Sequence, residues 1–494
     1  RGGGIDSPHP ASQRAAALVL TAALLTGAAF PAFADTYYIE NGDITISAGE
    51  SGNDVTQNNV TTKNDTDTII TNSDKATASS HTVTIDAGND KVEVTLKDVN
   101  IDTSSRNKAA VSVTGSGNTT IKLDGDNALK SDTSRSGIYG SGSLTISGGE
   151  NDSLTAQGGS GANGISSSGS LTISGGTVTA NGDDGGRGIS SSDSVTISGG
   201  STVTAKGGSG TISGGDGICS SGGGTISGGS TVTANGGNGG SIGGGSGIYS
   251  NGSLTISGGT VNANGGSGKN GNGGNGIIGS GRVAISGGTV NAAGGDGTNS
   301  NGGEGIYGRK GIDLSGSLEL TAKAGSPNGK ALSQDGNELN LDDIKDKLGP
   351  GAKVTTTDAN GKVNQVSIPR PVEPEKPVIP EESSSSSDGG SSAPSASVSS
   401  LPGLTVTDKD GQRISYTSTQ SGNTLTVCVG RLTASLHVSL AALRQLRAEG
   451  IETIAFQTVL CSTTLSVDEL LAMGGEDAEA VLTHRLTDSS LTVG

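Results

Sequence analysis

Three tyrosines occupy one repeated position of the chain, where they could stack on a sugar ring. Tyr139, Tyr249 and Tyr307 each directly follow a Gly-Ile dipeptide. The other copies of this position hold Ser166, Ser190, Cys219 and Ile278. If the isoleucines face inward in strands, the next residues face outward, and neighbouring strands lie about 4.8 Å apart. Tyr249 and Tyr307 would then lie roughly 10 Å apart on one face, which suits stacking on sugar rings. The alternative is that these tyrosines only cover the edge of a loop.

Adjacent carboxylates occur once in the regular repeats, at Asp183 and Asp184, in the same loop as Arg187. Carboxylate oxygens are ligands for calcium, so this pair is a candidate contact for calcium or for a sugar. The simpler interpretation is a solvated turn, because Asp is common in turns, and we favour it. We therefore expect no cofactor, with calcium as the alternative.

The other reactive residue types form no catalytic pattern in the sequence. Residues 138–325 contain no His, and His81, His437 and His484 each lack a nearby acid and nucleophile in a familiar arrangement. Polysaccharide hydrolases and lyases need clustered carboxylates or a positioned base, whereas these repeats carry scattered charges. We predict a non-catalytic protein. A hydrolase or lyase whose residues come together from distant repeats is the alternative.

Cysteines are few. Cys428 and Cys461 share the C-terminal segment and are a candidate disulfide in an oxidising compartment, which would leave Cys219 unpaired.

A repeat of nearly 30 residues organises the middle of the chain. The Gly-Ile isoleucines are Ile138, Ile165, Ile189, Ile218, Ile248, Ile277 and Ile306, spaced by 27, 24, 29, 30, 29 and 29 residues. A second isoleucine column and a Val/Leu column follow them. Within one unit, Leu171 and Ile173 alternate with Thr172 and Ser174, which is the period of a strand with one buried face. A fixed period of this size is typical of stacked repeats.

These patterns predict an all-β fold: a parallel β-helix with three short strands per turn, separated by Gly-rich bends. Right-handed crossovers are the usual outcome for parallel strands. One unit has too few aliphatic side chains to offset the entropy of ordering its backbone, so units must stack to be stable. Pairs such as Thr177 and Thr179 would face outward, an array that also resembles ice-binding surfaces, although it changes to Asn at Asn262 and Asn291.

Composition divides the chain into six parts. We expect a signal peptide with an upstream extension at 1–34, a cap and irregular β-helix turns at 35–137, regular repeats at 138–325, an irregular end of the solenoid at 326–368, a Pro/Ser-rich linker at 369–403, and a small α+β module at 404–494. In the module, Ser439 and Ser466 are candidate N-caps of two helices. Strands are expected from Thr424, Thr453 and Ala480.

Residues 14–34 resemble a secretory signal, with Arg14, an apolar run, and Ala32-Phe33-Ala34 before a cleavage site at Asp35. A membrane anchor is the alternative, but the apolar run is short for a span. We expect a secreted, cell-surface-associated protein that is not inserted in a membrane after cleavage. The net charge of −17 disfavours nucleic acid and anionic lipid as partners.

The segments VTLKDVNI (94–101), IKLDGDNALKS (121–131) and GIYGSGSLTISGG (137–149) carry a family resemblance. Together with the repeats, over about residues 80–325, they resemble the secreted parallel β-helix surface proteins of Gram-positive, often gut, bacteria that are described as carbohydrate-binding-domain-containing or adhesin-like. The resemblance implies a surface-exposed β-helix that binds acidic polysaccharide, with calcium in some members. The expected partner is a polysaccharide or a host or cell-surface glycan. The alternative is a structural stalk that presents the C-terminal module.

Overall fold

Each repeat forms three short parallel strands, and the strands of successive repeats stack into three long sheets. Val, Ile and Leu alternate with Thr and Ser along each strand, and Gly-rich segments make the bends. The computed structural model describes residues 35–370 and 403–493, except 409–410, 415, 422, 432, 459–461, 474–478 and 485–488. The expected signal segment and nearly all of the expected linker lie outside the described residues. The chain divides into two units, Arg1–Glu375 and Lys376–Gly494, which are described separately.

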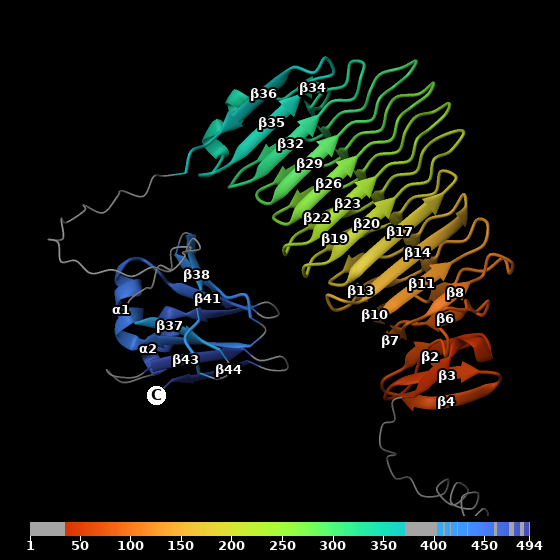
Figure 1. Ribbon diagram of the computed structural model, residues 1–494, viewed down its shortest axis with the longest axis horizontal. Helices are drawn as coiled ribbons and strands as arrows, with labels where there is room; N and C mark the ends of the chain where they lie inside the picture. The colour runs from red at the N-terminus through yellow and green to blue at the C-terminus, as the bar shows by residue number, and fades with distance from the viewer. Residues whose placement is uncertain are drawn as a thin grey trace, which may run out of the picture. The chain divides into compact units, whose positions relative to one another are not determined.

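The first unit is a β-solenoid built from sheets A, B and C, one strand of each per turn (Figure 1). Sheet A runs β1 (Thr36–Tyr38), β5 (Ile69–Thr71), β7 (Lys91–Lys97), β10 (Asn118–Asp124), β13 (Ser143–Ser147), β16 (Leu171–Ile173), β19 (Ser194–Ile197), β22 (Gly223–Ile226), β25 (Leu254–Ile256), β28 (Val283–Ile285) and β31 (Ile312–Leu314). All of its strand pairs are parallel. The expectation of an all-β parallel solenoid is confirmed.

Sheet B holds the Gly-Ile strands and has 14 strands. It runs β4 (Val60–Asp65), β3 (Asn53–Gln57), β2 (Ile44–Ala48), β6 (Val83–Asp86), β9 (Val111–Thr114), β12 (Ile138–Gly140), β15 (Ile165–Ser167), β18 (Ile189–Ser191), β21 (Ile218–Ser220), β24 (Ile248–Ser250), β27 (Ile277–Gly279), β30 (Ile306–Gly308), β33 (Leu332–Gln334) and β34 (Asn337–Glu338).

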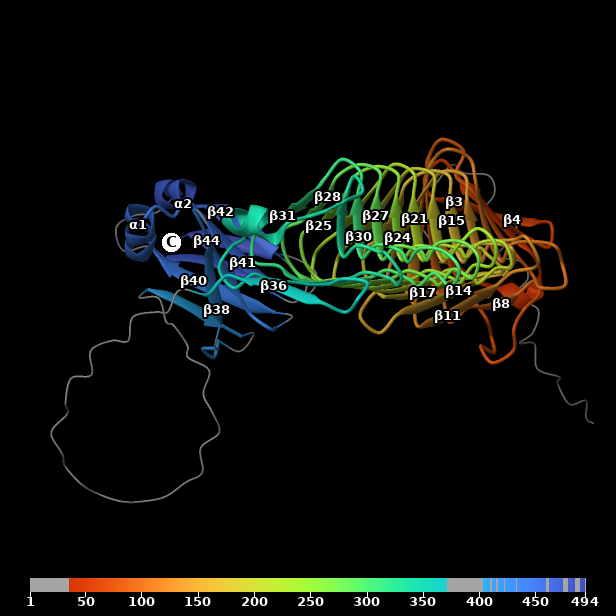
Figure 2. The same ribbon diagram turned by 90° about the horizontal axis from the view of Figure 1, so that it is seen from above.

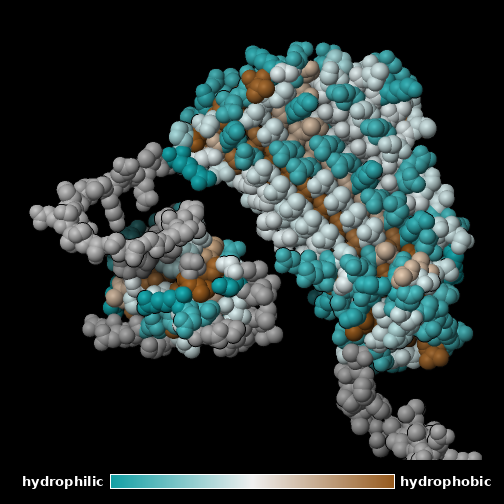
Figure 3. All heavy atoms as spheres, in the orientation of Figure 1, coloured by the Kyte–Doolittle hydropathy of each residue, from teal (hydrophilic) through white to brown (hydrophobic). Residues whose placement is uncertain are grey.

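Sheet C holds the Thr-rich strands. It runs β8 (Asn100–Asp102), β11 (Asp126–Lys130), β14 (Ser153–Ser160), β17 (Thr177–Asp183), β20 (Thr202–Lys206), β23 (Thr231–Asn235), β26 (Thr260–Asn264), β29 (Thr289–Ala293), β32 (Glu319–Lys323), β35 (Lys353–Thr357) and β36 (Val363–Ser367). Thr177, Thr202 and Thr231 stand in register on its outer face. On the side seen in Figure 3, hydrophilic and near-neutral residues cover most of the solenoid.

The core consists of aliphatic columns that run the length of the stack. Ile165, Ile189 and Ile218 of sheet B pair in register and are buried. The second isoleucine column belongs to sheet A and the Val column to sheet C, each aligned from turn to turn. Each buried side chain contributes about 1.5–3 kcal/mol relative to exposure. Each turn buries the aliphatic side chains of the next turn. Figure 2 shows the successive turns as parallel ribs.

The two ends of the solenoid differ from its middle because antiparallel strands close them. At the N-terminal end, β3 pairs antiparallel with both β2 and β4. At the other end, residues 326–368 form more than an irregular tail. β33 and β35 continue sheets B and C in parallel, and β34, β36 and a 3-10 segment, η2 (Leu341–Lys347), close the stack. A shorter 3-10 segment, η1 (Ile39–Asn41), follows β1.

The second unit contains two four-stranded sheets and two helices. One sheet runs β37 (Leu404–Thr407), β40 (Ala434–Ser439), β43 (Glu479–His484) and β44 (Ser489–Val493); the other runs β38 (Thr417–Ser421), β39 (Thr424–Cys428), β41 (Thr453–Gln457) and β42 (Ser462–Ser466). The helices are α1 (Leu440–Ala448) and α2 (Val467–Met473). Ser439 caps α1 by accepting from Ala442 N at 3.1 Å, and Ser466 Oγ accepts from Glu469 N at 3.4 Å. The predicted α+β module is confirmed.

Glycines permit the turns of the solenoid to stack at sheet spacing. A Cβ added at Gly245 would lie 2.0 Å from the carbonyl oxygen of Gly215 on the preceding turn. That distance is far inside van der Waals contact and the clashing atom is backbone, so neither turn can yield locally. The low side-chain content of the loops is therefore a requirement of their packing.

We expect Gly245→Ala to lower the free energy of unfolding by about 1–3 kcal/mol, the usual cost of overpacking. The matched control is Gly258→Ala, because no heavy atom lies within 4 Å of a Cβ there. Urea unfolding of the full chain and limited proteolysis at residues 236–247 measure the effect. Equal stability of the two variants would contradict this role of glycine.

Candidate functional site

The tyrosine column lies on the outer face of sheet B. Tyr139 pairs in register with Ser166, and Tyr249 and Tyr307 flank Ile278 on adjacent strands. Tyr139 is 44% exposed, whereas Tyr249 and Tyr307 are partly buried. Tyr249 and Tyr307 are two strands apart, about 10 Å, but four strand spacings, about 19 Å, separate Tyr139 from Tyr249. The three tyrosines therefore do not form one cluster.

Tyr139 lies in a groove of about 710 Å³, here called the Tyr139 groove. Its floor is the outer face of sheet B, including Thr84, Ser112 and Ser166. Its rim comes from the segments that precede β9 and β12, which contribute Lys108 and Arg135. Loops from neighbouring turns thus bring two cations beside one exposed aromatic ring.

Positive charge predominates at the Tyr139 groove. None of its lining residues is a carboxylate. Arg135 Nε donates to Asn107 Oδ1 at 3.3 Å, and Arg135 has no ion pair with the residues that the structure describes. Lys108 Nζ lies 3.2 Å from Asp43 Oδ2, which Arg106 also binds. The carboxylate of Asp43 thus pairs with both Arg106 and Lys108 beside the groove.

Asp43 fixes the base of this charge cluster. Its two oxygens accept from the Arg106 guanidinium at 2.8 and 3.1 Å, and Oδ1 accepts from Thr82 N at 2.9 Å. Partial burial alone would raise the pKa of Asp43, but hydrogen bonds from Arg106, Thr82 and Lys108 outweigh it and hold this pKa well below its usual range. Asp43 therefore stays ionised at neutral pH.

A second groove, of about 400 Å³, runs between the stacked Gly-rich loops. Its lining includes Asn272, Asn275, Asn301, Glu304, Asn328 and Lys330, and we call it the Asn groove. Neither Tyr249 nor Tyr307 lines it. The sequence contains a signal for this groove, because the similar tetrapeptides SGGD, GGGS, NGGN and NGGE begin at residues 213, 243, 272 and 301. The tyrosine column did not indicate it.

Asp183 and Asp184 lie on an exposed turn at the end of β17. The Asp183 carbonyl accepts from Gly186 N at 2.8 Å, and Asp184 and Gly185 have φ values of 42° and 84°, as in a type I′ turn. Asp183 Oδ1 accepts from Asp184 N at 2.9 Å. Arg187 points to the next turn, where its Nε lies 3.2 Å from Asp216 Oδ2. The local contacts are thus those of a turn, and calcium binding here stays a prediction.

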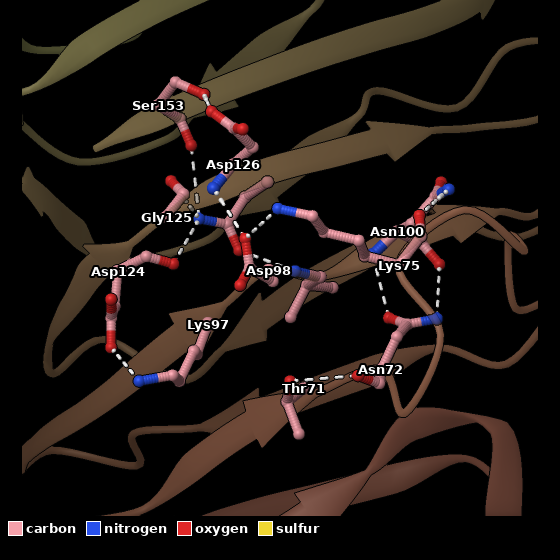
Figure 4. A network of polar contacts seen from close by, with 12 residues as sticks. Thr71, Asn72, Lys75, Lys97, Asp98, Asn100, Asp124, Gly125, Asp126 and Ser153 are labelled. Carbon is pink, nitrogen blue, oxygen red and sulfur yellow. Dashed lines mark hydrogen bonds and ion pairs between the residues drawn. The ribbon is translucent and has the colours of Figure 1, made fainter. Parts of the chain in front are cut away.

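Other acidic side chains gather at the corners between sheets A and C in the early turns (Figure 4). Lys97 Nζ lies 2.8 Å from Asp124 Oδ2, and Lys75 Nζ lies 3.0 Å from Asp98 Oδ1. Asp126 Oδ1 accepts from Ser153 Oγ at 2.8 Å. Lysines and hydroxyls thus hold these carboxylates, and no group of three or more His, Cys, Asp or Glu in the described residues is placed to hold a metal ion.

The cysteine prediction is only partly within the described residues. Cys428 in β39 lies with its Sγ 3.4 Å from Gln457 Oε1, and Cys461 lies outside the described residues. The Cys428–Cys461 disulfide stays a prediction. Cys219 is buried on the outer face of sheet B, between Ser190 and Tyr249. Burial raises the pKa of the Cys219 thiol to about 11, so the reactive thiolate is scarce at neutral pH.

The three histidines that the structure describes belong to separate places in the fold, and none of them lines either groove. His81 Nδ1 lies 3.2 Å from Asp43 Oδ1, and His437 Nδ1 lies 3.3 Å from Glu479 Oε2. His484 is fully buried in the C-terminal module, where its Nε2 lies 2.9 Å from Thr463 Oγ1 and its ring packs on Phe456. Burial lowers the pKa of His484.

The comparisons with known proteins give no relative. No family model matches the chain, and neither does any curated protein or solved structure. In the part of the chain that the structure describes, no helix has the length and apolar character of a membrane span.

We expect the buried His484 to make the C-terminal module sensitive to acid. Because its pKa is lower in the folded state, the unfolded chain takes up the proton first as pH falls below about 6.5. We expect the stability of this module to be constant above that pH and to fall below it. Hydrogen exchange of peptides from β40 and β41 between pH 7.5 and 5.5 measures the change, after correction for intrinsic exchange rates. His484→Gln should reduce the pH dependence. If the pH dependence persists in His484→Gln and is lost in His437→Gln, the assignment to His484 is wrong.

Proposed function

We propose that the solenoid is a non-catalytic glycan-binding domain of a secreted, surface-associated protein, and that it binds acidic polysaccharide in the Tyr139 groove. One observation carries this proposal. An exposed aromatic ring stands beside Lys108 and Arg135 in a groove whose lining residues include no carboxylate. An aromatic face stacks on a sugar ring, and the guanidinium binds a carboxylate with charge-assisted hydrogen bonds.

The electrostatics of the chain favour a local contact of this kind. With a net charge of −17 the protein as a whole repels a polyanion. Binding therefore depends on the two cations at the groove, and the surrounding hydroxyls of Thr84, Ser112 and Ser166 can hydrogen-bond to sugar hydroxyls. Such binding weakens as salt screens the charges.

The shape of the site supports a polymer as the ligand. The groove lies along successive strands of one rigid sheet, so several monosaccharides of one chain can lie on it. Backbone hydrogen bonds between turns hold the rim segments, for example from Gly137 N to Asn163 O. A preformed site loses little conformational entropy on binding. The signal-like segment 14–34 supports export of the protein.

We expect the full chain to bind at least one of polygalacturonate, alginate and hyaluronan. Neutral dextran should bind at the Tyr139 groove much more weakly than these acidic polymers. Arg135→Ala should weaken acidic binding about tenfold or more, because a charged hydrogen bond contributes about 1.5–3 kcal/mol and 1.4 kcal/mol is tenfold in affinity. Tyr139→Ala should also weaken acidic binding, because it removes the aromatic face on which the sugar ring stacks. Tyr307→Ala is the matched control, an aromatic on the same column outside the groove. Affinity electrophoresis or calorimetry measures the effects.

Two results would contradict the proposal. One is the absence of binding to all three acidic polymers, which would favour a structural stalk. The other is an equal loss in Tyr307→Ala and Tyr139→Ala, which would move the binding surface along sheet B.

A further inference from the structure

The Asn groove is built differently from the Tyr139 groove. Two successive turns each contribute a polar residue, two floor glycines and a second polar residue, Asn272 to Asn275 and Asn301 to Glu304, and the next turn contributes Asn328 and Lys330. The outer wall holds Asn272, Asn301 and Asn328, which are exposed, and the inner wall holds Asn275, Glu304 and Lys330, which are partly buried. The groove thus has the same arrangement of residue types on the turns of Asn272 and Asn301.

The floor of the Asn groove is rigid and has few free polar groups. Gly273 N donates to Asn301 O at 2.9 Å, and Gly274 N donates to Gly266 O at 2.8 Å. A Cβ on Gly273 would lie 1.8 Å from the carbonyl oxygen of Gly295. The glycines are therefore fixed between turns, and they leave a flat floor on which a sugar ring can lie.

Neighbouring turns also fix the direction of the amides on the walls. Asn275 Oδ1 accepts from Glu304 N at 2.8 Å, and Asn272 Oδ1 accepts from Asn301 N at 3.2 Å. A backbone N–H can only donate, so the oxygen of each amide is identified, and its Nδ2 is left as a donor. Neither Nδ2 has a hydrogen-bond partner among the residues that the structure describes. Asn301 Oδ1 accepts from Asn328 Nδ2 at 3.0 Å, so the Nδ2 groups of Asn272 and Asn301 are donors on successive turns of the outer wall, about 4.8 Å apart.

The charges of the Asn groove balance. Glu304 and Lys330 stand on successive turns of the inner wall, and neither makes an ion pair with the residues that the structure describes. The carboxylate offers acceptors and the ammonium offers donors, with no net charge between them. A charged polymer therefore gains nothing here, whereas a hydroxyl-rich neutral chain can meet both kinds of group.

We infer that the Asn groove is a second binding site, for a linear neutral polysaccharide that lies along the solenoid axis. Its sugar rings rest on the glycine floor and their hydroxyls bond to the amides of Asn272, Asn275 and Asn301 and to Glu304. The inference is independent of the Tyr139 groove, because the two sites share no lining residue and differ in charge.

Calorimetry of the full chain with cellohexaose, xylohexaose, mannohexaose and chitohexaose tests this inference. We expect binding of at least one of these neutral probes, with little change between low and high salt. Asn301→Ala should weaken it about two- to tenfold, since the lost hydrogen bond contributes about 0.5–1.5 kcal/mol.

Two controls separate the sites. Asn299→Ala removes an exposed amide that donates to Asn270 Oδ1 at 2.9 Å on the same loops, outside the groove, and should leave the affinity unchanged. Arg135→Ala should also leave it unchanged while weakening acidic binding. Thermal melts identify variants that fail to fold, and Asn301→Asp, which keeps the acceptor for Asn328 Nδ2 but removes the Nδ2 donor, then replaces Asn301→Ala. The absence of binding to all four probes, an equal loss in Asn299→Ala, or loss of neutral binding in Arg135→Ala would overturn the inference.

Discussion

The backbone of each turn must hydrogen-bond to the turns on both sides, and the rest of the solenoid depends on this constraint. It holds in the strands, where aliphatic columns align, and also in the loops, where Gly214 N donates to Gly243 O at 3.0 Å and Gly244 N to Asn272 O at 3.0 Å. Loops that pair in this way leave no room for Cβ atoms at many positions. The composition of the chain, poor in aromatic and rich in small residues, follows from the packing of its loops as well as from its short strands.

The same constraint decides where side chains can act. Inward positions are occupied by the core, and many loop positions must be glycine. Chemistry is therefore confined to the outward positions of the strands and to the few loop residues that flank the glycines. Because these positions repeat at the spacing of the strands, neighbouring turns make rows of like groups or, where the sequence varies, a local cluster such as Tyr139 with Lys108 and Arg135. A small number of substitutions can thus create or change a site without altering the scaffold.

The sequence predicted the repeat well, because Ile and Val recur at fixed positions and strand alternation is strict. It also predicted both helices of the C-terminal module, since Ser439 and Ser466 stand where N-caps belong. The grooves were harder to predict. Lys108 and Arg135 meet Tyr139 only after the register between turns is known, and no local pattern connects them. The tyrosine column suggested one surface, yet strand spacing places Tyr139 far from Tyr249. Asp183 and Asp184 were correctly expected to lie in a turn, whereas the amides of Asn272 and Asn275 were missed because Asn-Gly segments are also ordinary in loops.

The most direct test of the account is a crystal structure of the full chain with a bound hexasaccharide of galacturonate. The account predicts a sugar ring against Tyr139, a carboxylate on Arg135 or Lys108, and loop backbones that move by less than about 1 Å, as in other preformed sites. Saccharide bound over the Thr-rich face of sheet C, or a groove that forms only when the loops rearrange, would contradict the claim that stacked turns build a rigid glycan site.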